Sequence, residues 1–236
     1  ILHSPLIMSV SPTPVSLSQR NFLKLLIETE ALKFGSFTLK SGRSSPYFVN
    51  LGAVASTGAG LAALGAAYAE VLLRNELPFD LIFGPAYKGI PLASVTAAAM
   101  AQSGRSVRVS SNRKEAKTHG EGSAFIGATP KAGERVIIVE DVITAGTTLR
   151  EVVPLLRNDY GCLVNTVVIA VDRCERGAGS KRASVEAAEE HGLSVYAILT
   201  IYEIVQTLAQ PNDLGLTLSE SQLGSISDYL REYGAQ

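Results

Sequence analysis

Two acidic residues, Glu140 and Asp141, directly follow a run of β-branched residues and precede a short loop of small residues. The run, residues 136–139, predicts a strand that is buried on both faces of a parallel sheet. The segment 148–156 then returns to helical spacing, so a helix is expected to begin a few residues after the acids. Backbone amides at a helix start bind anions, and nearby hydroxyl groups can join them. The hydroxyl groups available here belong to Thr144, Thr147 and Thr148. The stretch therefore predicts a phosphate site beside two carboxylates.

A simpler interpretation is a strand with an acidic end, followed by threonines that cap the next helix. Acidic residues rarely occupy buried positions without a partner, and two in succession beside a phosphate-sized loop are unusual. We therefore favour the phosphate site.

The whole chain limits the kind of protein that can carry this site. Its 236 residues suit one α/β domain with a sizeable core, which we place at residues 16–236. Residues 1–15 are rich in Ser and Pro and lack the features of a signal peptide. We expect this tail to be disordered or to derive from an expression vector.

Composition argues against several classes of partner. The net charge of −1 gives no global field that would favour nucleic acid or an acidic membrane. No apolar run reaches the roughly 18 residues of a membrane span. Cys162 and Cys174 are the only cysteines, which gives neither a disulfide framework nor a metal-ligand pattern. Reduced thiols in a cytoplasmic protein are the expected state.

Other polar clusters also follow predicted strands. Residues 81–83 lead into a glycine-rich turn that contains Tyr87 and Lys88, and such a turn can lay backbone amides against a diphosphate. A plain strand-to-helix connection is the alternative. Residues 164–171 predict another buried strand, and Arg173 follows its end. Functional clusters at the carboxyl ends of strands predict a doubly wound, mostly parallel sheet flanked by helices, with its ligand beyond that edge.

Two further segments concentrate positive charge. The segment 110–123 is polar and has no hydrophobic periodicity, as is typical of a functional loop, and it lies between two predicted strands as a lid would. Its cations are Arg113, Lys114, Lys117 and His119. Residues 37–50 predict two extended segments around a Ser/Gly turn, with aromatic residues beside Lys40 and Arg43. A solvated loop and an ordinary amphipathic hairpin are the alternatives for these segments.

The segment 136–148 resembles the phosphoribosyl-diphosphate signature of type I phosphoribosyltransferases, although many members have Asp-Asp where this chain has Glu140 and Asp141. Taken with it, the segments 37–48, 84–90, 113–122 and 172–177 resemble the orotate phosphoribosyltransferase family, in the expected order. The resemblance extends over about residues 22–209. It implies the type I phosphoribosyltransferase fold, with a central mostly parallel sheet, a small hood built from the N-terminal region and a flexible lid loop.

The resemblance also implies an activity. The phosphoribosyl group of 5-phospho-α-D-ribose 1-diphosphate (PRPP) would be transferred to orotate, giving orotidine 5′-phosphate and diphosphate in UMP biosynthesis. Mg²⁺ would be held mainly through the diphosphate and the ribose, with no direct protein ligand. The enzyme would be a cytoplasmic homodimer whose lid loop is shared between subunits, and it would bind neither nucleic acid nor membrane.

Residue roles follow from the same resemblance. Lys117, Asp141 and Lys40 would be catalytic. The residues implied to bind PRPP are Lys40, Tyr87, Lys88, Arg113, Lys114, Lys117, His119, Glu140, Asp141, Val142, Ile143, Thr144, Ala145, Gly146, Thr147 and Thr148. The residues implied to bind orotate are Lys40, Phe48, the backbone at Val49, Thr144 and Arg173, with Arg173 pairing with the carboxylate of orotate.

Two alternatives share the central motif. A purine-type phosphoribosyltransferase gives no reason for the lysine-rich loop or for Arg173. A non-catalytic regulator on the same fold would need a basic face or an added helix-turn-helix to bind nucleic acid, and neither is evident in this near-neutral chain.

Overall fold

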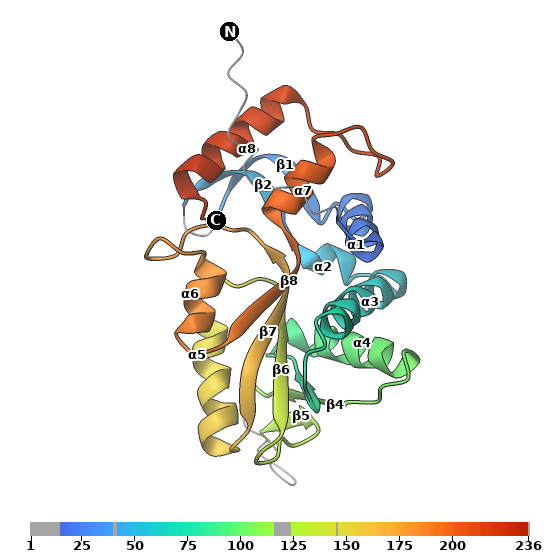
Figure 1. The fold of residues 1–236 in the computed structure, drawn as a ribbon, viewed down its shortest axis with the longest axis vertical. Coiled ribbons are helices and arrows are strands. Elements are labelled where there is room, and N and C mark those ends of the chain that lie inside the picture. The colour runs from blue at the N-terminus through green and yellow to red at the C-terminus, as the bar shows by residue number, and fades with distance from the viewer. Residues whose placement is uncertain (1–14, 40–41, 116–123, 145, 236) are drawn as a thin grey trace.

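The computed structural model describes residues 15–39, 42–115, 124–144 and 146–235, so nearly all of the expected tail lies outside it. In the described part, a six-stranded sheet with the order β5-β4-β3-β6-β7-β8 forms the centre of the molecule (Figure 1). Its strands are β3 (Leu81–Phe83), β4 (Arg108–Asn112), β5 (Phe125–Gly127), β6 (Arg135–Glu140), β7 (Leu163–Asp172) and β8 (Ser194–Thr200). All neighbours are parallel except β4 and β5, which confirms the expected mostly parallel sheet.

Helices cover both faces of this sheet (Figure 1). The elements on one face include α1 (Leu17–Glu28), α3 (Gly58–Arg74) and α4 (Gly89–Gln102), with the short α2 (Leu51–Val54) beside them. The other face carries α5 (Thr147–Pro154), its π-helical continuation η1 (Leu155–Asp159) and α6 (Ala183–Glu189). No described helix combines the length and the apolar character that a membrane span requires.

Strand β6 shows why its sequence is a continuous apolar run. Ile137 and Val139 belong to the core on the α3 and α4 face, whereas Val136 and Ile138 belong to the core under α5 and α6. Successive residues of a strand point to opposite faces, so a strand between two cores needs an apolar residue at every position. The prediction of a strand buried on both faces is therefore confirmed.

A second, smaller layer lies beyond the carboxyl ends of β6 and β7 (Figure 1). It contains the antiparallel pair β1 (Leu32–Thr38) and β2 (Ser44–Val49), together with α7 (Ile201–Leu208) and α8 (Glu220–Tyr233). The ring of Tyr229 on α8 packs edge-on against the ring of Tyr47 on β2, with centroids 5.7 Å apart. The hood therefore includes C-terminal as well as N-terminal elements, whereas the sequence predicted an N-terminal origin alone.

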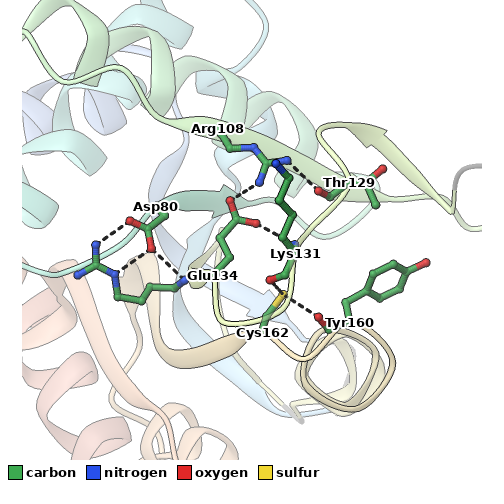
Figure 2. Close-up of polar contacts among 8 residues, drawn as sticks. Asp80, Arg108, Thr129, Lys131, Glu134, Tyr160 and Cys162 are labelled. Carbon is green, nitrogen blue, oxygen red and sulfur yellow. Dashed lines mark hydrogen bonds and ion pairs between the residues drawn. The ribbon is translucent and has the colours of Figure 1, made fainter.

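At the opposite, amino edge of the sheet, ion pairs join the starts of the strands (Figure 2). The Asp80 carboxylate accepts hydrogen bonds from the backbone N and the guanidinium of Arg135, at 2.6–3.1 Å. Arg108 pairs with Glu134, which also accepts from the backbone N of Lys131. Cys162 Sγ lies 3.4 Å from the Lys131 carbonyl oxygen. The exposed Asp80–Arg135 pair contributes little free energy, whereas the Glu134 side chain is only 8 % exposed. The network links the starts of β3, β4 and β6, whose register is set by their backbone pairing.

Candidate active site

A cavity of about 1080 Å³ opens between the hood and the carboxyl edge of the sheet. Four of the segments singled out in the sequence contribute to its wall. The predicted site residues that line it are Phe48, Val49, Lys88, Val142, Ile143, Thr144 and Arg173. The fold thus brings together residues that are far apart in the chain.

Glu140 and Asp141 lie at the end of β6, and each is only 8 % exposed. Backbone groups hold both. The Tyr68 hydroxyl donates to the Glu140 carbonyl oxygen at 2.6 Å, and the Asp141 N–H donates to Glu140 Oε1 at 3.1 Å. The Val142 N–H donates to Asp141 Oδ1 at 2.9 Å. The two N–H bonds orient the carboxylates, and the Tyr68 bond holds the backbone of Glu140.

Burial, together with the charge of Asp141, raises the pKa of Glu140 to about 8. A proton on Glu140 therefore stabilises the folded, ligand-free protein. This contribution to the free energy of unfolding is complete below about pH 4.5, where the carboxyl group is protonated in the folded and in the unfolded protein. It is lost as the pH rises through about 8.

Replacing Glu140 with Gln should remove this pH dependence, because Gln is neutral and its Oε1 can still accept the Asp141 N–H. Thermal unfolding of the ligand-free protein between pH 5 and pH 9 measures the effect. We expect the variant to exceed the wild type by on the order of 3 kcal/mol at pH 9 and to match it near pH 5. Glu28→Gln, a change at an exposed helical acid, is the control. Parallel pH profiles for Glu140→Gln and wild type would contradict the assignment.

Lys88 lies next to Asp141. Its Nζ donates to Asp141 Oδ2 at 2.6 Å, and its side chain is largely exposed to the cavity. The neighbouring Tyr87 is also exposed. Asn112 holds this turn in place, because its Oδ1 accepts a hydrogen bond from the Ala86 N–H at 2.9 Å. The sequence assigned Lys88 to a diphosphate, and in this structure its charge is paired with Asp141.

The turn that carries Lys88 depends on two glycines. A Cβ on Gly84 would lie 1.9 Å from the Gly89 carbonyl oxygen, and a Cβ on Gly89 would lie 2.7 Å from the Gly84 carbonyl carbon. Backbone packed this closely excludes any side chain, so the glycine-rich composition has a steric cause.

The loop after Glu140 and Asp141 leads into α5. Gly146 at its N-cap has a φ of 69° and no side chain to cap the helix, so among the described residues no side chain caps the first amides. Thr147 is exposed and Thr148 is partly buried. Uncapped amides with a positive dipole end are available to an anion. The phosphate loop that the sequence predicts therefore leads to a helix start whose first amides no described side chain caps.

The two ends of the cationic loop meet where β4 joins β5. The Arg113 N–H donates to the Ala124 carbonyl oxygen at 2.9 Å, and Lys114 Nζ donates to Glu151 Oε2 on α5 at 2.6 Å. Lys114 is thus bound to the helix that starts at the phosphate loop. The remaining predicted residues, Lys40, Lys117, His119 and Ala145, lie outside the described residues.

Arg173 enters the cavity from the end of β7. Its Nε donates to Glu175 Oε1 at 2.8 Å and its Nη2 donates to Ser45 Oγ at 3.0 Å. The guanidinium lies over the Tyr47 ring, 4.4 Å from its centroid. Phe48 also lines the cavity, and its ring stacks on Phe37 with centroids 5.6 Å apart. The cavity wall thus contains both a cation and an aromatic ring.

Sequence reasoning missed the residues that hold these groups in place. Asn112 and Glu175 were detectable, since each is a polar residue beside a predicted cluster. Ser45, Tyr47 and Tyr229 gave no signal, because their importance depends on contacts with distant parts of the chain.

Comparison with known proteins supports one family. The family model named phosphoribosyl transferase domain matches residues 54–196. The orotate phosphoribosyltransferase of Legionella pneumophila (strain Paris) is 45 % identical over 218 residues, which cover 92 % of this chain and 99 % of that protein. The enzyme of the same name from Pseudomonas aeruginosa is 45 % identical over 217 residues, covering 92 % and 98 %.

Solved structures agree. The crystal structure of orotate phosphoribosyltransferase from Francisella tularensis is similar with a TM-score of 0.79 and 30 % identity, covering 91 % of this chain and 100 % of that one. A UMP synthase from Leishmania donovani is similar with a TM-score of 0.70 and 27 % identity, covering 92 % of this chain and 43 % of that one. The chain belongs to the phosphoribosyltransferases, and within them to the orotate phosphoribosyltransferase family.

Proposed function

We propose that this chain transfers the phosphoribosyl group of PRPP to orotate, forming orotidine 5′-phosphate and diphosphate in UMP biosynthesis. The observation that carries the proposal is one cavity lined both by Arg173 and by residues 142–144, which lie between the paired acids and the uncapped start of α5. The arginine, the acids and the helix start each match a different part of the two substrates.

The ribose phosphate fits the edge of β6 and the start of α5. The 5-phosphate would accept hydrogen bonds from the first amides of α5 and from the hydroxyls of Thr144, Thr147 and Thr148. The ribose 2′ and 3′ hydroxyls would donate to the carboxylates of Glu140 and Asp141. Lys88 would then release its ion pair with Asp141 and bind the diphosphate, because the turn already places its Nζ beside the acids.

In the reaction, the bond between ribose C1 and the diphosphate oxygen breaks and its electron pair leaves with the diphosphate. N1 of orotate supplies the pair that forms the new bond to C1, and its proton passes to the departing diphosphate or to water. Negative charge grows on the diphosphate in the transition state, so fixed cations near it lower the barrier. Lys88 is one such cation, and we assign Lys40, Lys117, Arg113, Lys114 and His119 to the same task. Closing the loop that carries the last four would exclude water from the reactive sugar.

Mg²⁺ is the metal we assign to the reaction. The described residues contain no group of three or more potential metal ligands, but Glu140 and Asp141 offer hard oxygen donors beside the ribose position. This donor set fits an ion that is held mainly by substrate oxygens, with the two acids nearby. When bound, Mg²⁺ supplies positive charge to the departing diphosphate.

Orotate differs from a purine by its carboxylate, and Arg173 is the cation placed to receive it. Phe48 would pack on the pyrimidine ring, and the backbone at Val49 and the Thr144 hydroxyl would hydrogen-bond to it. All four residues line the cavity. A purine has no carboxylate for Arg173 to receive.

The test compares orotate with hypoxanthine as acceptors for PRPP. Because a site built around a charged partner discriminates strongly against a ligand that lacks it, kcat/KM should favour orotate by about 10⁴-fold or more. Orotidine 5′-phosphate formation should also stop when EDTA removes Mg²⁺. Turnover of hypoxanthine in preference to orotate would establish the purine alternative instead.

We also propose a homodimer in which the loop 113–122 serves the neighbouring active site. The first residues of this loop are anchored to the described fold, because Lys114 Nζ donates to Glu151 Oε2 on α5. Sedimentation showing only a 24.9 kDa species at micromolar concentration would exclude this assembly. The two free, buried cysteines, Cys162 and Cys174, support a reducing compartment such as the cytoplasm.

A further inference from the structure

The C-terminal end of α8 lies against the loop that follows β7. The Tyr229 hydroxyl donates to Glu175 Oε1 at 2.8 Å, and its ring packs on Tyr47. Tyr229 is 6 % exposed, so water does not compete freely for this bond. The last helix of the chain thus contacts the wall of the cavity, 54 residues away in sequence.

Glu175 connects this helix to the arginine. One oxygen, Oε1, accepts from the Tyr229 hydroxyl and from Arg173 Nε, both at 2.8 Å. The side chains of Arg173 and Glu175 are 13 % and 15 % exposed. In such a setting a hydrogen bond to a charged group is stronger than at the surface and defines the geometry of the ion pair.

The contacts leave Arg173 little freedom. Its Nε and Nη2 both contact Glu175 Oε1, at 2.8 and 2.6 Å, and Nη2 also donates to Ser45 Oγ. One face of the guanidinium covers the Tyr47 ring. The Nη1 side of the fork is therefore the side that a ligand carboxylate can approach without displacing Glu175. If Glu175 turned away, the guanidinium could rotate and lose this orientation.

Backbone bonds hold the helix end independently of the Tyr229 hydroxyl. The Arg176 N–H donates to the Tyr233 carbonyl oxygen at 2.7 Å, and the Ala235 N–H donates to the Cys174 carbonyl oxygen at 2.8 Å. Removing the hydroxyl alone should leave the helix in place. Its effect on the arginine can therefore be separated from its effect on the fold.

We propose that Tyr229 is a positioning residue for the nucleobase substrate: through Glu175 it fixes Arg173 in the orientation that receives the orotate carboxylate. This inference rests on the proposed function and extends it to the last helix. Tyr229 touches no substrate. Its influence should appear in the binding of orotate and not in the binding of PRPP, whose site lies on β6 and α5.

The test is the Tyr229→Phe variant, which keeps the ring against Tyr47 and removes the hydroxyl. We expect KM for orotate to rise about tenfold, the effect of losing one hydrogen bond to a charged group, with kcat and KM for PRPP changed less than twofold. The matched control is Tyr202→Phe, which removes a hydroxyl that donates to the Ala235 carbonyl oxygen at 3.4 Å and should leave all three constants unchanged.

A double-mutant cycle with Glu175→Gln completes the experiment. If both residues act through Arg173, the double variant should raise KM for orotate no more than the larger single change. An unchanged KM for orotate in Tyr229→Phe, or equal losses for both substrates, would overturn the proposal. If Tyr229→Phe fails to fold, an unchanged KM for orotate in Glu175→Gln overturns it instead. A wild type that turns over no orotate would refute the proposed function, whereas failure of the variants alone refutes only this inference.

Discussion

Replacing Asp141 with Asn should lower kcat/KM for PRPP by about 10²–10³-fold, the usual effect of removing one charged group that contacts the transition state. Asn has the same size and its Oδ1 can still accept the Val142 N–H, so the fold should be retained. What is lost is the negative charge that pairs with Lys88 and that would bind the ribose hydroxyls. Steady-state kinetics with PRPP as the varied substrate measures the effect.

Asp80→Asn is the matched control, because it makes the same chemical change at the opposite edge of the sheet. Its kcat/KM should stay within twofold of wild type. An Asp141→Asn enzyme with normal kinetics would remove Asp141 from the site. If the loop is shared between subunits, mixing Asp141→Asn with Lys117→Ala should restore activity through one intact site per heterodimer. Mixtures that stay inactive would contradict the shared loop.

Replacing Gly84 with Ala should destabilise the fold by about 3 kcal/mol or more, because the new Cβ meets the backbone oxygen of Gly89 and the Cβ of Ala93. The clash involves backbone that is fixed by β3 and α4, so it has no low-cost relief. In a chain of 236 residues such a loss lowers Tm by roughly 6–12 °C. Thermal unfolding measures it, and any folded fraction should bind PRPP poorly because Lys88 would be displaced.

Gly58→Ala is the control for this prediction. Gly58 lies at the start of α3, where an added Cβ would meet no atom within 4 Å. This change should be neutral or stabilising by about 0.5 kcal/mol, since alanine restricts the unfolded chain more than glycine does. Equal Tm values for Gly84→Ala and Gly58→Ala would show that the turn can adapt.

The sequence predicted those parts of the fold that depend on local patterns. The apolar run of β6 predicts a strand with both faces buried. The start of α5 follows from the return of helical spacing after Gly146. These features depend on neighbours a few residues away, so the chain itself contains the evidence.

Contacts between distant segments were not predictable in this way. No pattern indicates that Tyr229 reaches Glu175, because α8 would have the same amphipathic sequence on any apolar surface. The pairing of Lys88 with Asp141 was hidden for a related reason. Each residue has a plausible role of its own, and only the sheet order places β3 beside β6. The identity of the base came from resemblance and not from the physics of single residues.

The ion pairs at the amino edge have a consequence for how such a protein can be altered. Asp80 and Arg135 link the starts of β3 and β6 at the end of the sheet that faces away from the cavity. We expect substitutions at this edge to leave the residues that line the cavity in place, because none of the cavity residues belongs to the ion-pair network. At the carboxyl edge the two properties are coupled, since Gly84 serves both the stability of the turn and the placement of Lys88. The amino edge is therefore the place where stability can be altered without altering the site.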